Sequence, residues 1–464
     1  MKDKDNSVTT INPATGEEIK TYKFMTNKEA SSVVEKCHEA FLDWRMVSPK
    51  VRAKAIKSIG ESLKKHKDVL VKLMTQEMGK LLKHGEQEVD LCIGLCDYTA
   101  KSGPKEFEDE HRELTEGGKG IVTYQPIGVI YGIQPWNFPT YQVMRYALAN
   151  LMAGNGVLLK HAENVTGCSQ LLEKIFTDSD LPKDIFKILI ISHDQSDEII
   201  KNEKVRGVTL TGSSEAGKYV GKLAAENLKK TVLELGSNDA YLVLEDANIE
   251  KAVKWSVQGR IYNNGETCVA AKRFIVVEKV YDEFKEAFVK AMDDLKHGDP
   301  TDENSKLGPI AREDLRNDLH KQVEKSVKNG AEILCGGKIP EGKGYYYPST
   351  VLGNVKSGQP AYDDELFGPV ASLIKAKDAE DAMRIANDSR FGLGGGIFSE
   401  DKENAIELAK KHFDTGMVLI NGFGLAQPNM PFGGVKNSGY GREHGGFGMK
   451  EFVNVKSILM LNDK

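Results

Sequence analysis

The chain has 464 residues and a formal net charge of −5, with 63 Lys plus Arg against 68 Asp plus Glu. This mildly acidic balance gives no reason to expect nucleic acid or an anionic membrane surface as a partner. No apolar run approaches the roughly 20 residues of a membrane helix, and the first residues, 1–6, lack the apolar core of a secretory signal. Six scattered cysteines do not form a disulfide framework in a chain of this length, so we expect a cytoplasmic protein.

The first hundred residues are predicted to pack rather than to react. Residues 7–25 read as short strands around a turn at 12–16, a cluster of turn-forming residues. Apolar residues then recur at helical spacing from 27 to about 101, and we expect one helix that begins at Thr26 or Asn27, a second from Pro49, and a third near Val69. The pattern breaks at 102–104 and again at 117–118.

Strands and helices alternate in the middle of the chain. Residues 120–134 are rich in Val, Ile and Tyr and alternate as strands do. From 156 to 235, apolar strand-like runs are separated by helical stretches about every 25 residues. This rhythm predicts a parallel sheet with helices on both faces, which binds ligands beyond the carboxyl ends of its strands.

The second half repeats the alternation less regularly. A strand at 370–375, a helix at about 379–387 and a buried strand at 417–421 are expected. The chain closes on an apolar strand at 452–460, whose open edge would pair with another subunit as a homodimer or homotetramer forms.

A cysteine in a polar, glycine-containing loop is the first candidate for chemistry. Cys268 ends the segment 263–268, between a predicted helix at 249–261 and a predicted strand at 273–277. A thiol in such a loop is easier to expose and activate than one on an apolar face. The alternative is one more buried thiol. Cys92 and Cys96 lie one helical turn apart without further ligands nearby, so we expect no metal site.

Two stretches at predicted strand ends are suited to a nucleotide. Gly212, Ser213 and Gly217 lie in a turn between a strand and a helix, where backbone N–H groups attract phosphate. Lys160 and Glu163 follow another strand end, where they suit a ribose. A plain turn and ordinary surface charge are the alternatives.

Two further side chains suit the chemistry of a thiol nucleophile. Glu234 stands between two leucines at a strand end, and burial would raise its affinity for a proton, as a general base requires. Asn137 lies in a rigid aromatic turn and offers an amide N–H of the kind that holds an oxyanion. A carboxylate at the rim and a helix-capping amide are the alternatives.

Together these segments resemble the NAD(P)-dependent, hydrolytic aldehyde dehydrogenases over essentially the whole length. The resemblance is carried by six motifs and a glycine-rich tail: 135–139, the strand end at Lys160, 211–217, 234–236, 265–268, 365–369 and 431–443. It implies an α/β fold with a Rossmann-like doubly wound cofactor domain (1–103 and 125–236), a second α/β catalytic domain (237–436) and a small β oligomerisation extension (104–124 and 447–464).

The resemblance also implies roles for individual residues. Cys268 would attack the aldehyde carbon, the Asn137 amide and the Cys268 N–H would hold the oxyanion, and Glu234 would activate the hydrolytic water. The implied cofactor, NAD with NADP possible, would be held by Trp136, Lys160, Glu163, Gly212, Ser213, Gly217, Glu365 and Phe367. A Glu at 163 would repel a 2′-phosphate and accept a ribose hydroxyl.

Several positions depart from the family pattern. Glu266 stands where Gln is common, a carboxylate that would raise the pKa of the nearby thiol, and His161 stands where Pro is common. Within the family the chain looks most like the succinate-semialdehyde dehydrogenases, which place an Arg at the position of Arg145 to hold the substrate carboxylate. Their second Arg is Tyr262 here, with Arg260 close by as a candidate substitute.

The leading hypothesis is therefore oxidation of a small aldehyde, succinate semialdehyde first, to a carboxylic acid through a cysteine thioester. The alternatives are a dehydrogenase for another small aldehyde, an aldehyde dehydrogenase that acylates coenzyme A, and a structural protein of the same fold. Glu234 argues against acyl transfer to coenzyme A, because that route needs no hydrolytic base.

Overall fold

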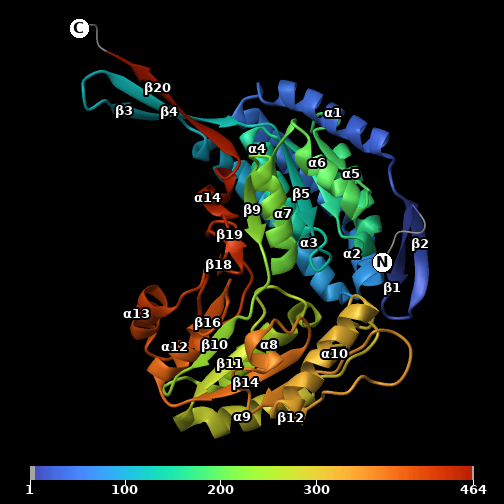
Figure 1. Cartoon of the computed structure of the whole chain (residues 1–464), viewed down its shortest axis with the longest axis vertical. Helices are drawn as coiled ribbons and strands as arrows, with labels where there is room; N and C mark the ends of the chain where they lie inside the picture. The colour runs from blue at the N-terminus through green and yellow to red at the C-terminus, as the bar shows by residue number, and fades with distance from the viewer. Residues whose placement is uncertain (1–5, 462–464) are drawn as a thin grey trace.

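The computed structural model describes residues 6–461 and consists of two layered α/β bodies with a β-sheet arm (Figure 1). Residues 1–5 and 462–464 lie outside the described part. The prediction that residues 1–6 are not a secretory signal therefore lies almost wholly outside the described residues. The end of the predicted oligomerisation segment 447–464 lies outside them as well. Among residues 6–461, no helix has the length and apolarity needed to cross a bilayer.

The N-terminal region packs against the first body. β1 (Ser7–Asn12) and β2 (Glu17–Lys23) pair antiparallel around the predicted turn, where the Gly16 N–H donates to the Asn12 carbonyl. Three long helices follow: α1 (Asn27–Trp44), α2 (Pro49–Met78) and α3 (Leu82–Glu106). α1 begins with a capping box in which Thr26 and Glu29 exchange hydrogen bonds, as its sequence indicates.

Two sequence-based predictions fail in this region. The second and third predicted helices are one helix, α2, because the charged stretch 64–68 between them favours helix and contains no breaker. The predicted break at 102–104 lies inside the last turns of α3. Gly103 is required there by packing, since a Cβ would stand 2.6 Å from the Met152 side chain.

The first body is built on a six-stranded sheet of order β19-β9-β8-β5-β6-β7. Its elements are, in chain order, β5 (Val129–Gln134), α4 (Tyr141–Ala153), β6 (Gly156–His161), η1 (Glu163–Val165), α5 (Thr166–Thr177), β7 (Phe186–Ile188), α6 (His193–Lys201), β8 (Val205–Thr211), α7 (Ser214–Glu226) and β9 (Lys230–Glu234). β5 to β9 run parallel, with helices and apolar clusters on both faces, which confirms the doubly wound prediction. β19 (Gly439–Tyr440) joins β9 antiparallel from the far end of the chain.

The second body is built on a seven-stranded sheet of order β12-β13-β14-β11-β10-β16-β17. Its elements are β10 (Ala240–Val243), α8 (Ile249–Ile261), η2 (Tyr262–Gly265), β11 (Arg273–Val277), α9 (Glu278–Asp293), α10 (Glu313–Lys328), β12 (Glu332–Cys335), β13 (Thr350–Gly353), α11 (Pro360–Asp363), β14 (Val370–Ala376), α12 (Ala379–Asn387), β16 (Gly395–Phe398), α13 (Lys402–His412) and β17 (Leu419–Ile420). The predicted strand at 417–421 is shorter and only half-buried, because it lies at the edge of the sheet. β15 (Phe391–Gly392) and β18 (Val435–Lys436) form a small separate pair.

The arm is a three-stranded antiparallel sheet of order β20-β4-β3. β3 (Glu110–Glu113), β4 (Lys119–Pro126) and β20 (Val453–Met460) form it, and α14 (Gly445–Met449) precedes β20. Figure 1 shows the arm projecting from the first body, with β20 at the end of the chain. The α/β class and the three parts are as expected, whereas the residue boundaries of three domains stay a prediction.

Candidate active site

The carboxyl ends of four parallel strands bring the predicted residues to one edge of the first sheet. β5, β6, β8 and β9 end at Gln134, His161, Thr211 and Glu234. β5 pairs with both β6 and β8, so the strand order reverses at β5. Ligands of doubly wound sheets bind at such a switch point. Trp136 and Asn137, Lys160, Gly212 and Ser213, and Glu234 all lie at or directly after these ends.

The loop that carries the candidate nucleophile Cys268 spans residues 263–268 and is called the nucleophile loop. It begins with a tight turn. Asn263 and Asn264 have positive φ angles of 54° and 59°, a conformation that Asn tolerates better than most residues. Gly265 has φ 78°, and a Cβ there would stand 2.4 Å from the backbone of Gly368. These constraints fix the course of the chain up to three residues before the nucleophile candidate.

Cys268 is a partly exposed free thiol at the end of this turn. Four of the other cysteines are buried, and only Cys335 is similarly accessible. The Cys268 side chain packs beside Val269 and Phe432 in a small apolar cluster. Burial raises the pKa of the Cys268 thiol to about 11, against the opposing effect of Arg145 and Lys272. The thiol therefore needs a proton acceptor or nearby positive charge to act as a nucleophile.

Lys272 supplies one of those charges and also holds the loop. Its Nζ donates to the carbonyl oxygens of Cys268 (2.5 Å) and Thr267 (3.3 Å) and to the Ser237 hydroxyl (2.8 Å). The same ammonium group lies 3.2 Å from Oε1 of Glu365. Lys272 thus connects the nucleophile loop to a residue expected to hold the cofactor.

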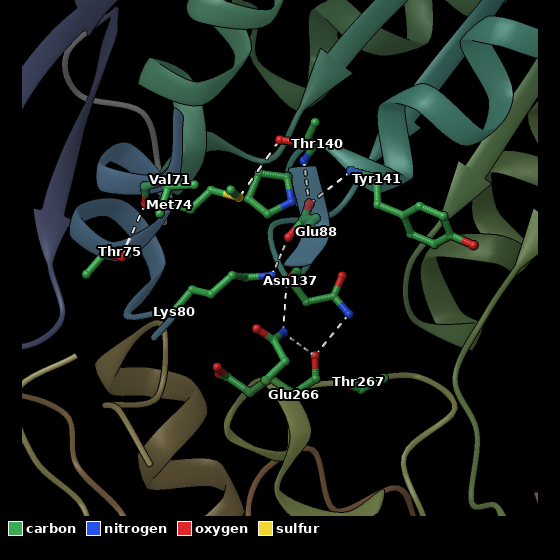
Figure 2. Close-up of polar contacts among 12 residues, drawn as sticks. Val71, Met74, Thr75, Lys80, Glu88, Asn137, Thr140, Tyr141, Glu266 and Thr267 are labelled. Atoms are coloured by element: carbon green, nitrogen blue, oxygen red, sulfur yellow. Dashed lines mark hydrogen bonds and ion pairs between the residues drawn. The ribbon is translucent and has the colours of Figure 1, made fainter. Parts of the chain in front are cut away.

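Asn137 is cross-tied to the nucleophile loop. Its Nδ2 donates to the Glu266 carbonyl (3.1 Å), and its own carbonyl accepts from Asn263 Nδ2 (2.9 Å), as Figure 2 shows for Asn137 and Glu266. Within residues 6–461, no acceptor takes the Cys268 N–H, and the two N–H bonds of Asn137 Nδ2 have one acceptor, the Glu266 carbonyl. An amide and a backbone N–H therefore stand ready near the thiol, as an oxyanion site requires.

Glu234 is a buried carboxyl group at the end of β9. Among the described residues neither of its oxygens has a hydrogen-bond partner. Burial, reinforced by the Glu443 carboxylate, raises the pKa of Glu234 well above its usual range, and Arg145 opposes that shift. A carboxyl group in this state is suited to general acid–base work near neutral pH.

Arg145, on α4, stands among these groups. It forms an ion pair with Glu443, donates from Nη2 to the Thr211 hydroxyl (3.2 Å), and lies 4.8 Å from the centroid of the Phe432 ring. Its charge acts on both Cys268 and Glu234. Phe432, in the same apolar cluster as Cys268, thus also lies against the Arg145 guanidinium group, which already has a carboxylate partner in Glu443.

Arg260 lies against the loop that carries Cys268. It is fully buried, and its Nη2 donates to the Gly265 carbonyl at 2.7 Å. Burial lowers the pKa of its guanidinium to about 9. Tyr262, which replaces the second family Arg, stacks on Phe138 with centroids 6.3 Å apart. Arg260 therefore supports the nucleophile loop from beneath.

The two other departures from the family pattern have local partners. The Glu266 carboxyl accepts from the Ala311 N–H at 3.0 Å, and burial raises its pKa well above its usual range. Its expected effect on the thiol pKa stays a prediction. The His161 Nε2 donates to the Pro139 carbonyl (2.8 Å), and burial lowers the pKa of this imidazole to about 4.

The residues expected to hold a dinucleotide suit it in different ways. Lys160 is buried, and no acceptor within residues 6–461 takes a hydrogen bond from its ammonium group. Glu163 is half-exposed, 4.0 Å from the His193 imidazole. Gly212 has open space where a Cβ would stand, whereas a Cβ at Gly217 would lie 2.4 Å from Leu235. Gly212 therefore suits phosphate approach, and Gly217 serves the packing of α7 on the sheet.

The two aromatic residues expected beside the nicotinamide lie next to each other. The rings of Trp136 and Phe367 meet edge to face with centroids 5.7 Å apart.

Ser213, expected at the phosphates, caps α7, where its hydroxyl accepts from the Ala216 N–H (3.2 Å). Within the described chain, no group of three His, Cys, Asp or Glu side chains is placed to hold a metal ion.

Sequence reasoning missed Lys80, Glu88, Lys272 and Glu443. Glu443 lies in a tail motif that was identified as a whole, and Lys272 follows Cys268 closely, so both had a local signal. Lys80 and Glu88 had no such local signal. Lys80 is a charged residue between two helices, and Glu88 is a charged residue among the apolar positions of α3. Their burial is visible only in the folded chain.

Comparison with known proteins agrees with this geometry. Residues 1–458 match the model of the aldehyde dehydrogenase family. The chain is 43% identical to an Escherichia coli protein named succinate semialdehyde dehydrogenase (NAD(P)+), over 97% of this chain and 96% of that protein. It is 40% identical to a Mycobacterium leprae protein named succinate-semialdehyde dehydrogenase (NADP(+)), over 97% of this chain and 99% of that one.

The fold is also similar to that of solved structures. The crystal structure of succinic semialdehyde dehydrogenase from Streptococcus pyogenes, in complex with NADP+, superimposes with a TM-score of 0.96 at 36% identity, covering 98% of this chain and 100% of that one. With a family model matched over nearly its whole length and a thiol, an amide and a carboxyl group gathered at one sheet edge, this chain belongs to the aldehyde dehydrogenase family.

Proposed function

We propose that the protein oxidises an aldehyde to a carboxylic acid through a thioester on Cys268. The Cys268 thiol first gives its proton to water, a loss that the positive charges of Arg145 and Lys272 favour. The thiolate then attacks the carbonyl carbon, and the oxygen, now negative, is held by the Asn137 amide and the Cys268 N–H. A bound NAD or NADP supplies the acceptor for the hydride that leaves this carbon. Glu234 then takes a proton from water, whose oxygen attacks the thioester carbon and displaces the thiolate. The observation that carries this proposal is the hydrogen bond from the Asn137 amide to the Glu266 carbonyl, two residues before Cys268, with Glu234 at the end of β9 on the same sheet edge as Asn137.

The proposed cofactor is NAD, with NADP accepted. Lys160 and Glu163 lie where a ribose would sit, and Gly212 leaves room for phosphate at the start of α7. The half-exposed Glu163 carboxylate favours a ribose hydroxyl over a 2′-phosphate, whereas several relatives carry NADP(+) in their names. Trp136, Ser213, Glu365 and Phe367 complete the proposed cofactor contacts, and Gly217 supports them by packing.

The proposed substrate is succinate semialdehyde. The names of the relatives support it, and Arg145 is the proposed partner of the distal carboxylate. Arg145 Nε faces Glu443 and Nη2 faces Thr211, so Nη1 is the nitrogen left for a second carboxylate within the described residues. For Arg260 we propose support of the loop, because its Nη2 donates to the Gly265 carbonyl at 2.7 Å.

Turnover of the purified protein tests this proposal. Succinate semialdehyde with NAD should yield succinate and NADH, and Cys268→Ala should abolish the reaction. Full activity of that variant would reject Cys268 as the nucleophile. A higher kcat/KM for an uncharged aldehyde of equal length would reject the carboxylate preference alone, and point to another small aldehyde.

Two alternatives are separated by the product. An acyl-CoA product in the presence of coenzyme A would indicate acyl transfer, against which the position of Glu234 argues. No turnover with any aldehyde, together with a Cys268 that resists alkylation in the native protein, would indicate a structural protein of the same fold.

We also propose that the chain forms a homodimer or homotetramer through the arm. β20 is an edge strand with four exposed apolar side chains: Val455, Ile458, Leu459 and Met460. Such an edge favours pairing with a second strand. Truncation after Gly448 should lower the assembly size in light scattering, and an unchanged size would contradict this interface. The free thiols favour a cytoplasmic location.

A further inference from the structure

An ion pair is fully buried directly behind the turn that carries Asn137. Lys80, between α2 and α3, places its Nζ 2.5 Å from Glu88 Oε2 on α3, and neither side chain has any exposed surface. Removing two charges from water is costly, and such a pair is retained only where its geometry is good and its other hydrogen bonds are satisfied. Burial lowers the pKa of the Lys80 ammonium.

The remaining hydrogen bonds of the pair all go to the segment 137–141. Lys80 Nζ donates to the Asn137 carbonyl at 2.9 Å and lies 4.1 Å from the centroid of the Phe138 ring. Glu88 Oε1 accepts from the backbone N–H groups of Thr140 (2.8 Å) and Tyr141 (2.9 Å). These are free donors at the start of α4, where a helix favours negative charge. Figure 2 shows this arrangement, with Glu88 facing Thr140 and Tyr141 and Lys80 reaching Asn137.

Asn137 is also held from the opposite side by the nucleophile loop. Its carbonyl accepts from Asn263 Nδ2 (2.9 Å), and its Nδ2 donates to the Glu266 carbonyl (3.1 Å). The backbone of Asn137 is therefore fixed between α2–α3 and the loop of Cys268. Because the amide extends from this backbone by only two rotatable bonds, its direction depends on these contacts.

We propose that Lys80 and Glu88 are positioning residues that hold the Asn137 amide toward the oxyanion formed at Cys268. The proposal rests on the proposed function, since it assigns the pair to the oxyanion donor of that reaction. A pair that served folding alone would not need both its charges directed at one turn. An oxyanion donor acts fully only when its position is fixed before the reaction, and a displacement of about 1 Å can lower the rate about 100-fold.

The test removes both charges while keeping the shape. In Lys80→Met/Glu88→Gln, the side-chain amide oxygen introduced at position 88 can still accept from the two N–H groups of α4. We expect kcat for acyl-enzyme formation to fall about 100-fold, with KM for the cofactor and the rate of Cys268 alkylation by iodoacetamide unchanged. The matched control is Lys67→Met/Asp90→Asn, because Lys67 and Asp90 form an ion pair between α2 and α3 at the surface. It should keep full activity.

A double-mutant cycle distinguishes positioning from a general loss of structure. In an Asn137→Ala background, Lys80→Met/Glu88→Gln should lower kcat no further, because the group on which the pair acts is gone. Additive losses in the cycle, or full kcat in the folded Lys80→Met/Glu88→Gln variant, would overturn the proposal.

Two further outcomes are separate. If the double variant does not fold, Glu88→Gln alone carries the test with the same expected fall in kcat. Failure of both variants to fold would assign the pair to stability and overturn the positioning role. Absence of aldehyde turnover in the unmodified protein would reject the proposed function itself, before any variant is made.

Discussion

The side-chain amide of Asn137 donates to the backbone carbonyl of Glu266, two residues before Cys268, at 3.1 Å. The residue proposed to hold the oxyanion is thereby tied to the loop that carries the proposed nucleophile. Glu266 contributes its carbonyl to this contact, while its carboxyl group turns toward Ala311. The backbone at position 266 thus serves the site, and its side chain serves the packing behind it.

Glu234→Gln should separate the two chemical steps. The thioester should form with one equivalent of NADH per subunit, and hydrolysis should slow about 10²–10⁴-fold, the usual contribution of a general base. In the unmodified protein, the hydrolytic rate should rise with pH through the raised pKa of Glu234, because the base acts only when deprotonated. Rapid-mixing kinetics measure the rates of NADH formation and of hydrolysis. A Glu234→Gln variant without a burst of NADH would contradict the assignment of Glu234 to the hydrolytic step alone.

Glu266→Gln should stabilise the protein increasingly as pH rises. Burial raises the pKa of Glu266 well above its usual range, so the folded state keeps a proton that the unfolded state loses above about pH 4.3. Native stability therefore falls with rising pH, by at most about 1.4 kcal/mol per pH unit, and Gln removes this loss. Thermal unfolding at pH 4.5 and 8 should show the gain only at pH 8. The exposed Glu286→Gln on α9 is the control and should show none.

Lys272→Met should make Cys268 less reactive. The ammonium group lowers the thiol pKa, so its removal shrinks the thiolate fraction, tenfold for each unit of pKa. Iodoacetamide alkylation between pH 7 and 10 measures the change, with Cys268→Ala as the background. Lys279→Met, which removes a surface ammonium near Glu245, should leave the rate unchanged. An unaltered alkylation profile in Lys272→Met would show that this charge does not act on the thiol.

Glu163→Gln should shift the cofactor preference toward NADP. Loss of the carboxylate removes repulsion of a 2′-phosphate, and we expect the kcat/KM ratio of NADP to NAD to rise about tenfold, equivalent to ~1.4 kcal/mol. Glu198→Gln on the exposed face of α6 is the matched control. A ratio that stays the same, or falls, would place the 2′-hydroxyl away from Glu163.

Local sequence determined most of the fold and the candidates for chemistry. Helix periodicity, caps and apolar strand runs depend on neighbours in the chain, so α8, β11 and α12 fall at the predicted residues. Parallel strands place their ends at one edge, which is why Lys160 and Glu234 were expected there, whereas the resemblance to the family added Asn137. Errors arose where packing overrode local signals, as at Gly103, whose missing Cβ serves contact with Met152 rather than a break.

Only the tertiary structure decided which partner each charged side chain has. Arg145 meets Glu443, Lys80 meets Glu88 beneath the Asn137 turn, and Lys272 reaches Glu365. A charged side chain can be recognised from the sequence alone. Its ion-pair partner depends on long-range packing, because a charge buried away from water is costly unless an opposite charge lies beside it.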